Sequence, residues 1–326
     1  MRKKLAWRIA GWLFAIAAVV FFCAAGWFFY QHLAAQKTYA EVQEEAVVAT
    51  AAPTTPGPTL EEILNAPFEG IIDAEETKIP PEVFTGVEEA PIDFAWLRDV
   101  NPELYAWIYI PDTQIDYPIG QHAGEDQEYY LHHDLYGTPQ FAGCIFSQAP
   151  NALDFSDPVT VLYGHNMKNG SMFQNLYFFL QDPDFFNSHK YIYLYMDGKT
   201  LVYEVISAYY SDNLNLLLAD GDDEEDAVDA EDVEETGNIR DPEATKDAEE
   251  TKDPGRIDYT DEEVFMAYLE DCRNPRVMER MVRDEADLDV ELNSDSRILT
   301  LSTCRAGFPW QRYLVQAVLA YEKDVS

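Results

Sequence analysis

The strongest constraint on the fold is a run of apolar and β-branched residues that ends in a cysteine, Ile298 to Cys304. Such a run predicts a β-strand. Because side chains alternate between the two faces of a strand, Thr300, Ser302 and Cys304 share one face and the intervening residues share the other. Cys304 is therefore expected at the end of a strand, with its thiol at the edge of a sheet.

A second β run follows this cysteine closely. Residues 305–311 contain Gly and Pro and end the first strand, and residues 312–320 return to an apolar pattern. If the two runs pair as a hairpin, Cys304 and Arg312 face each other across the mouth of the loop, where cross-strand neighbours lie roughly 5 Å apart. The pattern therefore predicts a thiol and a guanidinium in one small site.

A nucleophilic cysteine needs a neighbour that activates it, because a free thiol is mostly protonated at neutral pH. The candidate is His165, which follows a buried-looking strand at residues 159–163 that is broken by Gly164. Cys304, His165 and Arg312 are all predicted at strand ends, where loops gather and functional sites form.

The rest of the pattern is that of a mainly β chain. Short strands are expected at residues 107–110, 115–119, 129–131, 142–146, 191–196 and 201–209, with a two-residue turn before the last. A short helix is expected at 94–97, and a second one after Thr260, whose hydroxyl would form a capping box with Glu263. Many short strands with few helices favour a barrel or a sandwich.

The N-terminal third is expected to contain an anchor and a spacer. Residues 1–8 carry a positive cluster and are predicted to be cytoplasmic. Residues 9–30 form an apolar run about long enough to cross roughly 30 Å of hydrocarbon as a single helix. A cleaved signal peptide is the alternative. Residues 31–91 include an Ala-, Thr-, Pro- and Gly-rich stretch and predict an extracellular stalk.

Acidic residues dominate one segment of the remaining domain, which spans 92–326. Residues 220–256 contain 17 Asp or Glu against four Lys or Arg. The low-complexity insertion at 219–257 is therefore expected to stay solvated. A calcium site is the alternative, although the spacing matches no EF-hand loop. The formal net charge of −38 argues against nucleic acid as a partner, because little basic surface is left to contact phosphates.

Three cysteines lie outside the apolar N-terminal run: Cys144, Cys272 and Cys304. An odd number cannot all pair within one chain, and their spacing indicates neither a disulfide framework nor a zinc site. One free, reactive thiol is the simplest interpretation, and a disulfide between Cys144 and Cys272 remains open. We expect no metal and no other cofactor.

Several ordered motifs together resemble a sortase, and more narrowly a class B sortase. They are TLSTC at 300–304 with Arg312 after it, YGHNMKNGSMF at 163–173, WIYIP at 107–111, IDYP at 115–118, YYLHHD at 129–134 and GCIF at 143–146. The resemblance extends from about 93 to 322, apart from the acidic insertion. It implies a closed β-barrel of about eight strands, with an N-terminal helix and a helix before the strand of Cys304.

The resemblance also implies an activity. Sortases are cysteine transpeptidases that cut a C-terminal sorting signal of a secreted protein after Thr and join the carbonyl to an amine of a peptidoglycan precursor of the lipid II type. On this basis Cys304 is the expected nucleophile, His165 the general acid and base, and Arg312 the hydrogen-bond donor to the substrate carbonyl and the oxyanion.

Four further residues are expected to contact the substrate: Ser302, Tyr163, Thr303 and His132. The resemblance places Ser302 at the floor of the groove, and an ordinary strand serine is the alternative. Tyr163 would form a wall of the site or else belong to the core. His132 is expected to line the groove from the segment at 129–134.

Three other functions stay open at this stage. One is a pilin-polymerising sortase, in which the amine comes from a pilin lysine. Another is a non-catalytic, anchored β-domain that binds peptide or cell wall, which predicts an unreactive Cys304. The third is a hydrolytic cysteine peptidase, in which an added amine leaves the product unchanged.

Overall fold

The computed structural model describes residues 19–23, 26, 37–43, 45–46, 92–212, 216–217, 256–305 and 307–324. The strands within them are β1 (Leu104–Tyr109), β2 (Asp116–Gly120), β3 (Ile145–Phe146), β4 (Val159–Tyr163), β5 (Tyr191–Met196), β6 (Lys199–Ser211), β7 (Arg280–Val282), β8 (Ile298–Arg305) and β9 (Phe308–Asp324). The helices are α3 (Phe94–Val100), α4 (Tyr129–His132), α5 (Phe178–Gln181), α6 (Pro183–Ser188) and α7 (Glu262–Arg273), with short 3-10 turns at Phe173–Tyr177 and Glu285–Asp287.

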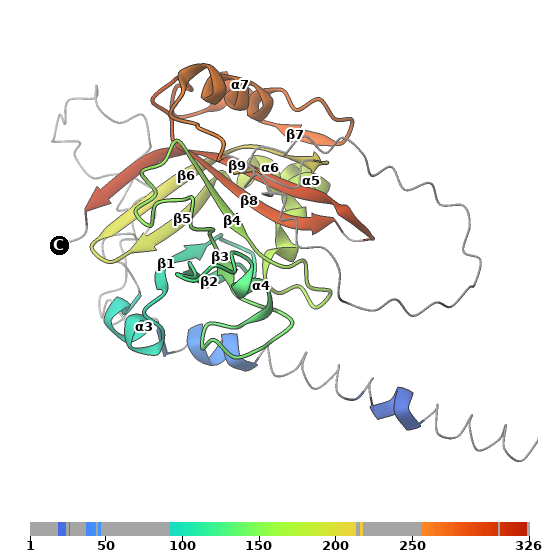
Figure 1. Ribbon diagram of the computed structural model, residues 1–326. Helices are drawn as coiled ribbons and strands as arrows, with labels where there is room; N and C mark the ends of the chain where they lie inside the picture. The colour runs from blue at the N-terminus through green and yellow to red at the C-terminus, as the bar shows by residue number, and fades with distance from the viewer. Residues whose placement is uncertain are drawn as a thin grey trace, which may run out of the picture.

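Eight of the strands close into a barrel (Figure 1). Their order is β5-β1-β2-β3-β4-β8-β9-β6, and pairing between β5 and β6 joins the two ends. The short strand β7 pairs with β6 outside this ring. Neighbours are antiparallel except for β2–β3 and β4–β8. Closure leaves these eight strands without a free edge, and the expected barrel of about eight strands is confirmed.

Alternation along β8 divides the core between the inside and the outside of the barrel. Leu299 and Leu301 belong to the larger cluster of buried residues, which also holds Trp107 and Tyr313. Ile298 belongs to a second cluster, together with Phe265, Leu269 and Cys272 of α7. Helix α7 therefore covers the outer face of the barrel next to the strand that carries Cys304 (Figure 1).

Helix α7 begins at a different cap from the predicted one. The carboxylate of Asp261 accepts hydrogen bonds from the backbone N–H groups of Glu263 at 2.9 Å and Val264 at 3.2 Å. The Thr260 hydroxyl instead donates to the carboxylate of Asp258. The predicted capping box of Thr260 and Glu263 is therefore wrong, because a better acceptor stands one residue later.

The predicted strand at 129–131 is also wrong, because these residues form helix α4. The backbone N–H of Leu131 donates to the carbonyl of Glu128 at 2.8 Å. Tyr130 is buried, and its hydroxyl donates to Glu103 at 2.7 Å. Packing of this ring overrides the β preference of two adjacent tyrosines. The strand expected at 142–146 is reduced to the two residues of β3.

Part of the predicted stalk packs against the barrel. Residues 37–43 and 45–46 are helical, and Tyr39, Val42 and Ala46 are buried in the main core cluster. The backbone N–H of Asp93 donates to the carbonyl of Ala46 at 2.9 Å, so this helix directly adjoins the start of α3. Residues 37–43 and 45–46, which belong to the segment expected as a spacer, therefore pack on the barrel as a helix.

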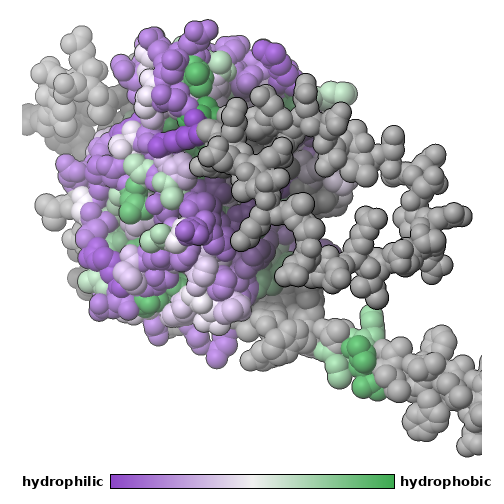
Figure 2. All heavy atoms as spheres, in the orientation of Figure 1, coloured by the Kyte–Doolittle hydropathy of each residue, from purple (hydrophilic) through white to green (hydrophobic). Residues whose placement is uncertain are grey.

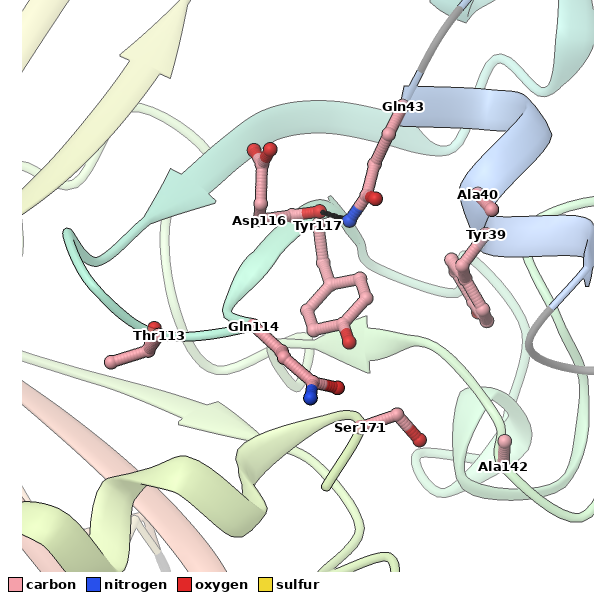
Figure 3. A pocket seen from close by; sticks show the side chains of 9 residues that line it. All are labelled: Tyr39, Ala40, Gln43, Thr113, Gln114, Asp116, Tyr117, Ala142 and Ser171. Carbon is pink, nitrogen blue, oxygen red and sulfur yellow. Dashed lines mark hydrogen bonds between the residues drawn. The ribbon is translucent and has the colours of Figure 1, made fainter. Parts of the chain in front are cut away.

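A cavity of about 360 Å³ lies between this N-terminal helix and the barrel (Figure 3). The amide of Gln43 donates to the backbone carbonyl of Asp116 at 2.6 Å, and the Tyr39 hydroxyl donates to the carbonyl of Gly143. Burial raises the pKa of the Asp116 carboxyl, which accepts a hydrogen bond from the Trp107 indole at 2.6 Å. The two hydrogen bonds from Gln43 and Tyr39 hold the helix on the barrel.

Residues 19–23 are helical and strongly exposed, with 62–72% of the surface of Val19, Val20, Phe21 and Phe22 accessible. Figure 2 shows that the visible face of the described barrel is mostly hydrophilic by comparison. Within the part of the chain that the structure describes, no helix has both the length and the apolar character needed to cross a bilayer. The predicted span at 9–30 lies mostly outside the described residues, as does the acidic insertion at 219–257.

Candidate active site

The predicted pairing of Cys304 with Arg312 is present. The two residues are directly opposite each other in the antiparallel pair of β8 and β9. A guanidinium nitrogen, Nη1 of Arg312, lies 3.5 Å from Sγ of Cys304. A bulge follows at once, because Arg305 pairs with Phe308 instead of continuing the register. The half-buried thiol is thus held at a strand end beside a permanent positive charge.

A cavity of about 270 Å³ opens at this thiol. It is lined by Glu128, Leu131, Phe146, Gln148, Tyr163, Gly164, Ser302, Thr303, Cys304 and Arg312. The hydroxyl groups of Ser302 and Thr303 are buried and have no hydrogen-bond partner among the described residues. The carboxylate of Glu128, the amide of Gln148 and the guanidinium of Arg312 give the cavity a polar lining, which suits a polar ligand such as a peptide.

The chain around His165 runs beside Cys304. Strands β4 and β8 are parallel, with Tyr163 opposite Ser302, and the backbone N–H of Gly164 donates to the carbonyl of Ser302 at 3.2 Å. Beyond the imidazole, Nδ2 of Asn166 donates to the carbonyl of Cys304 at 3.0 Å. The structure therefore brings the segments of His165 and Cys304 together from distant parts of the chain.

The imidazole of His165 is fixed by two contacts. Its Nε2 lies 2.8 Å from the carbonyl oxygen of Leu131, and its ring stacks on that of Phe141 with 5.4 Å between centroids. A carbonyl oxygen only accepts, so Nε2 carries the proton and Nδ1 of the neutral ring retains a lone pair. Burial lowers the pKa of His165, which favours the neutral ring at neutral pH.

Of the four predicted substrate contacts, three line the cavity and one does not. Tyr163, Ser302 and Thr303 are cavity residues, and Tyr163 also packs on Phe146 with 5.5 Å between ring centroids. His132 lies at the end of α4 and is not among the lining residues. Its ring centroid is 6.4 Å from that of His165, so it borders the imidazole instead of the groove.

Sequence reasoning missed several residues of the site. Asn166 and Tyr177 both bond the carbonyl of Cys304, the latter through its hydroxyl at 3.3 Å. Asn166 stands inside the motif at 163–173 and could have been noticed there, whereas no pattern around Tyr177 indicated its contact. Glu128 and Gln148 could not be placed because they lie in loops with no predicted direction.

Comparison with known proteins finds similarity to sortases. The model of the sortase domain matches residues 108–237. Sortase B of Listeria monocytogenes is 40% identical over 121 residues, which are 35% of this chain and 48% of that protein. Sortase B of Staphylococcus aureus is 25% identical over 217 residues, which are 66% of this chain and 68% of that protein.

The chain is thus similar to class B sortases over the residues that these matches cover. The first of these matches spans about half the length of the Listeria relative. A crystal structure of a sortase B complexed with triglycine covers 75% of this chain and 92% of its own, with 21% identity and a TM-score of 0.50, and shares its fold. In this chain, the motifs at 163–173 and 300–304 that resemble those of sortases both contribute residues to the cavity at Cys304.

Proposed function

We propose that this chain is a class B sortase and acts as a cysteine transpeptidase. It cleaves the C-terminal sorting signal of secreted proteins after Thr, holds the acyl group as a thioester, and passes it to an amine of a cell-wall precursor. The observation that carries the proposal is the 3.5 Å approach of the Arg312 guanidinium to the Cys304 thiol at the head of a peptide-sized cavity. Similarity to sortases supports the reaction class.

In the first step Cys304 attacks the carbonyl carbon of the threonyl bond. The neutral imidazole of His165, whose Nε2–H is held by Leu131, takes the thiol proton on Nδ1. A C–S bond forms, the C–N bond breaks, and the leaving amine receives that proton. The guanidinium of Arg312 stabilises the thiolate and then the oxygen that becomes negative in the tetrahedral intermediate.

In the second step the amine acceptor attacks the thioester. His165 removes the proton from the acceptor nitrogen, an amide bond forms, and the C–S bond breaks to release the thiolate of Cys304. Thioester formation divides one difficult exchange into two easier steps. Ser302, Thr303 and Tyr163 line the cavity that would hold the peptide between these steps.

The same proposal includes a place in the cell. Residues 9–30 would anchor the chain in the cell membrane as a single span with a cytoplasmic N-terminus, and the barrel would lie outside. The exposed apolar helix at 19–23 supports such an anchor. Because residue 37 already belongs to the helix packed on the barrel, only residues 31–36 would separate the two, which is at most about 20 Å of extended chain.

Mass spectrometry of the full chain with threonyl sorting peptides tests the function. We expect a thioester adduct on Cys304, released as an amide product when triglycine is added, and no adduct for Cys304→Ala. An acid product that triglycine leaves unchanged would indicate a hydrolytic peptidase. Transfer only to a pilin lysine would indicate pilus assembly. A thiol that resists alkylation at neutral pH would indicate a non-catalytic binding domain.

A further inference from the structure

The catalytic cavity carries two opposite charges from different elements. Arg312 of β9 supplies a guanidinium, and Glu128 at the N-cap of α4 supplies a carboxylate. Arg312 is already engaged, because its Nη1 contacts the Cys304 thiol. Glu128 is the acidic residue among the lining residues, and the mechanism above does not use it.

The carboxylate of Glu128 has no structural task that the described residues reveal. It makes no cap hydrogen bond to α4, although Glu128 occupies the N-cap position. None of the ion pairs formed by the described residues involves it. Its side chain is exposed at the cavity wall and is therefore accessible to a ligand.

The backbone of Glu128 is nevertheless pinned. Its N–H donates to the carboxylate of Asp126 at 3.0 Å, and its carbonyl accepts from the N–H of Leu131 at 2.8 Å. Leu131 in turn accepts the Nε2–H of His165 through its own carbonyl. The carboxylate thus stands on a short segment that also positions the imidazole.

Both charges act on the same side chain of the cavity wall. Burial raises the pKa of the Tyr163 hydroxyl, and among the charges around it Arg312 lowers this pKa whereas Glu128 raises it. The Tyr163 hydroxyl is thus within electrostatic reach of the carboxylate and of the guanidinium. A ligand in the cavity meets a negative group and a positive group within the span of one peptide.

We propose that Glu128 selects a protonated primary amine on the ligand that enters the catalytic cavity, which makes it a specificity-determining residue. The ammonium belongs either to a lysine next to the threonine of the sorting peptide or to the accepting amine. In the second case His165 removes a proton from that amine before it attacks. This inference rests on the proposed transpeptidation.

The test compares Glu128→Gln with Glu125→Gln in the full chain. Gln keeps the shape of the side chain and removes its charge. Glu125 is exposed in the same acidic loop and does not line the cavity, which makes it the matched control. One arm measures the rate of adduct formation on Cys304 with sorting peptides that differ only in lysine or norleucine before the threonine. The other arm measures transfer to triglycine, which is cationic, and to hydroxylamine, which is neutral at the same pH.

The two sources give different results. If the lysine binds Glu128, the wild type acylates faster with the lysine peptide, and E128Q loses that preference by about threefold or more, as expected of one solvent-accessible ion pair. If the accepting amine binds Glu128, E128Q raises the KM for triglycine by a similar factor and leaves the KM for hydroxylamine unchanged. In both cases the difference between wild type and E128Q becomes smaller at high salt, because salt screens the ion pair.

The inference is overturned if wild type and E128Q show the same preferences in both arms, or if E125Q reproduces every effect of E128Q. Failure of the proposed function is distinct from this. In that case the wild type itself forms no adduct with any peptide, so the Gln variants have no acylation or transfer rate to compare.

Discussion

The side chain of Asn166 bonds the backbone of Cys304, with 3.0 Å between Nδ2 and the carbonyl oxygen. Asn166 directly follows the imidazole residue, and the Tyr177 hydroxyl reaches the same carbonyl at 3.3 Å. The loop after β4 and the end of β8 are thereby held as one unit. Relative placement of the thiol and the imidazole therefore depends on groups that take no part in proton transfer.

Replacing Asn166 by Ala should slow acylation while leaving the fold intact. We expect a loss of about tenfold or more in the acylation rate, because small displacements of reacting groups are costly. Nδ2 of Asn166 also donates to the Tyr177 hydroxyl at 3.1 Å, so stability should fall by about 2 kcal/mol, the usual contribution of two hydrogen bonds. Stopped-flow acylation and thermal unfolding measure the two effects. Tyr177→Phe removes the other bond to the Cys304 carbonyl, and equal rates for wild type and both variants would contradict the positioning role.

Arg312→Lys should be far more damaging than its conservative appearance suggests. The guanidinium offers several fixed donors next to Cys304, whereas an ammonium on a flexible stem cannot keep that geometry. We expect kcat to fall by about a hundredfold, as for loss of an oxyanion donor. Arg305→Lys is the control, since Arg305 stacks on Tyr210 and bonds Gln311. A similar loss in both variants would point to a general effect of charge or folding.

Stability should depend on pH through His165. Burial lowers the pKa of this imidazole below its unfolded value of about 6.5. The unfolded chain therefore binds the proton more readily, so the stabilisation from the neutral ring is present above that value and is lost as pH falls through the folded pKa. Urea unfolding between pH 7 and 5 should show a smaller decline for His165→Asn than for wild type. Parallel curves would refute the assignment.

The N-terminal helix should contribute to the stability of the barrel. A chain that starts at residue 47 loses the buried side chains of Tyr39, Val42 and Ala46, whereas one that starts at residue 31 keeps them. We expect the shorter chain to unfold several kilocalories per mole more easily, because a single large core side chain is worth about 3 kcal/mol or more. Thermal unfolding of the two chains provides the measurement. Equal melting temperatures would restore the interpretation of 31–91 as a spacer.

Excision of residues 218–255 should leave the barrel folded, and Arg256 is kept because its guanidinium pairs with Asp157. The two ends of this segment already meet, since the N–H of Ile257 donates to the carbonyl of Leu217 at 3.0 Å. Joining them by a four-residue Gly/Asn turn halves the loop length about three times. Each halving lowers the entropic cost of closing the loop by roughly 0.6 kcal/mol. We therefore expect a melting temperature that is unchanged or higher. A lower one would show that the acidic segment contributes contacts of its own.

The hairpin of Cys304 and Arg312 was predictable because local signals determine it. Alternation assigned the residues to faces, and Gly307 marked the turn, whereas Pro309 lies within β9, which begins at Phe308 and not at the expected residue 312. The strand before His165 was visible for the same reason. His165 lies near Cys304 because β4 and β8 pair in parallel, and no local sequence pattern specifies such a pairing. The family resemblance was needed to predict that the two residues share a site.

The failures of prediction share one cause, which is packing between distant segments. Two tyrosines at 129–130 favour a strand by themselves, and the burial of Tyr130 against Glu103 and Gly120 makes them helical. Residues 37–46 look polar in sequence, and three spaced side chains suffice to bury one face. Glu128 entered no prediction because its importance comes from the cavity that it borders.

The parallel pairing of β4 with β8 also sets an order of events during synthesis. Residues 164–297 separate these strands along the chain, so β8 is synthesised long after β4, and the barrel cannot close before β8 and β9 are both available. A nascent or truncated chain carries its histidine long before it acquires a partner thiol. The proposed nucleophile, Cys304, therefore joins His165 only late in folding.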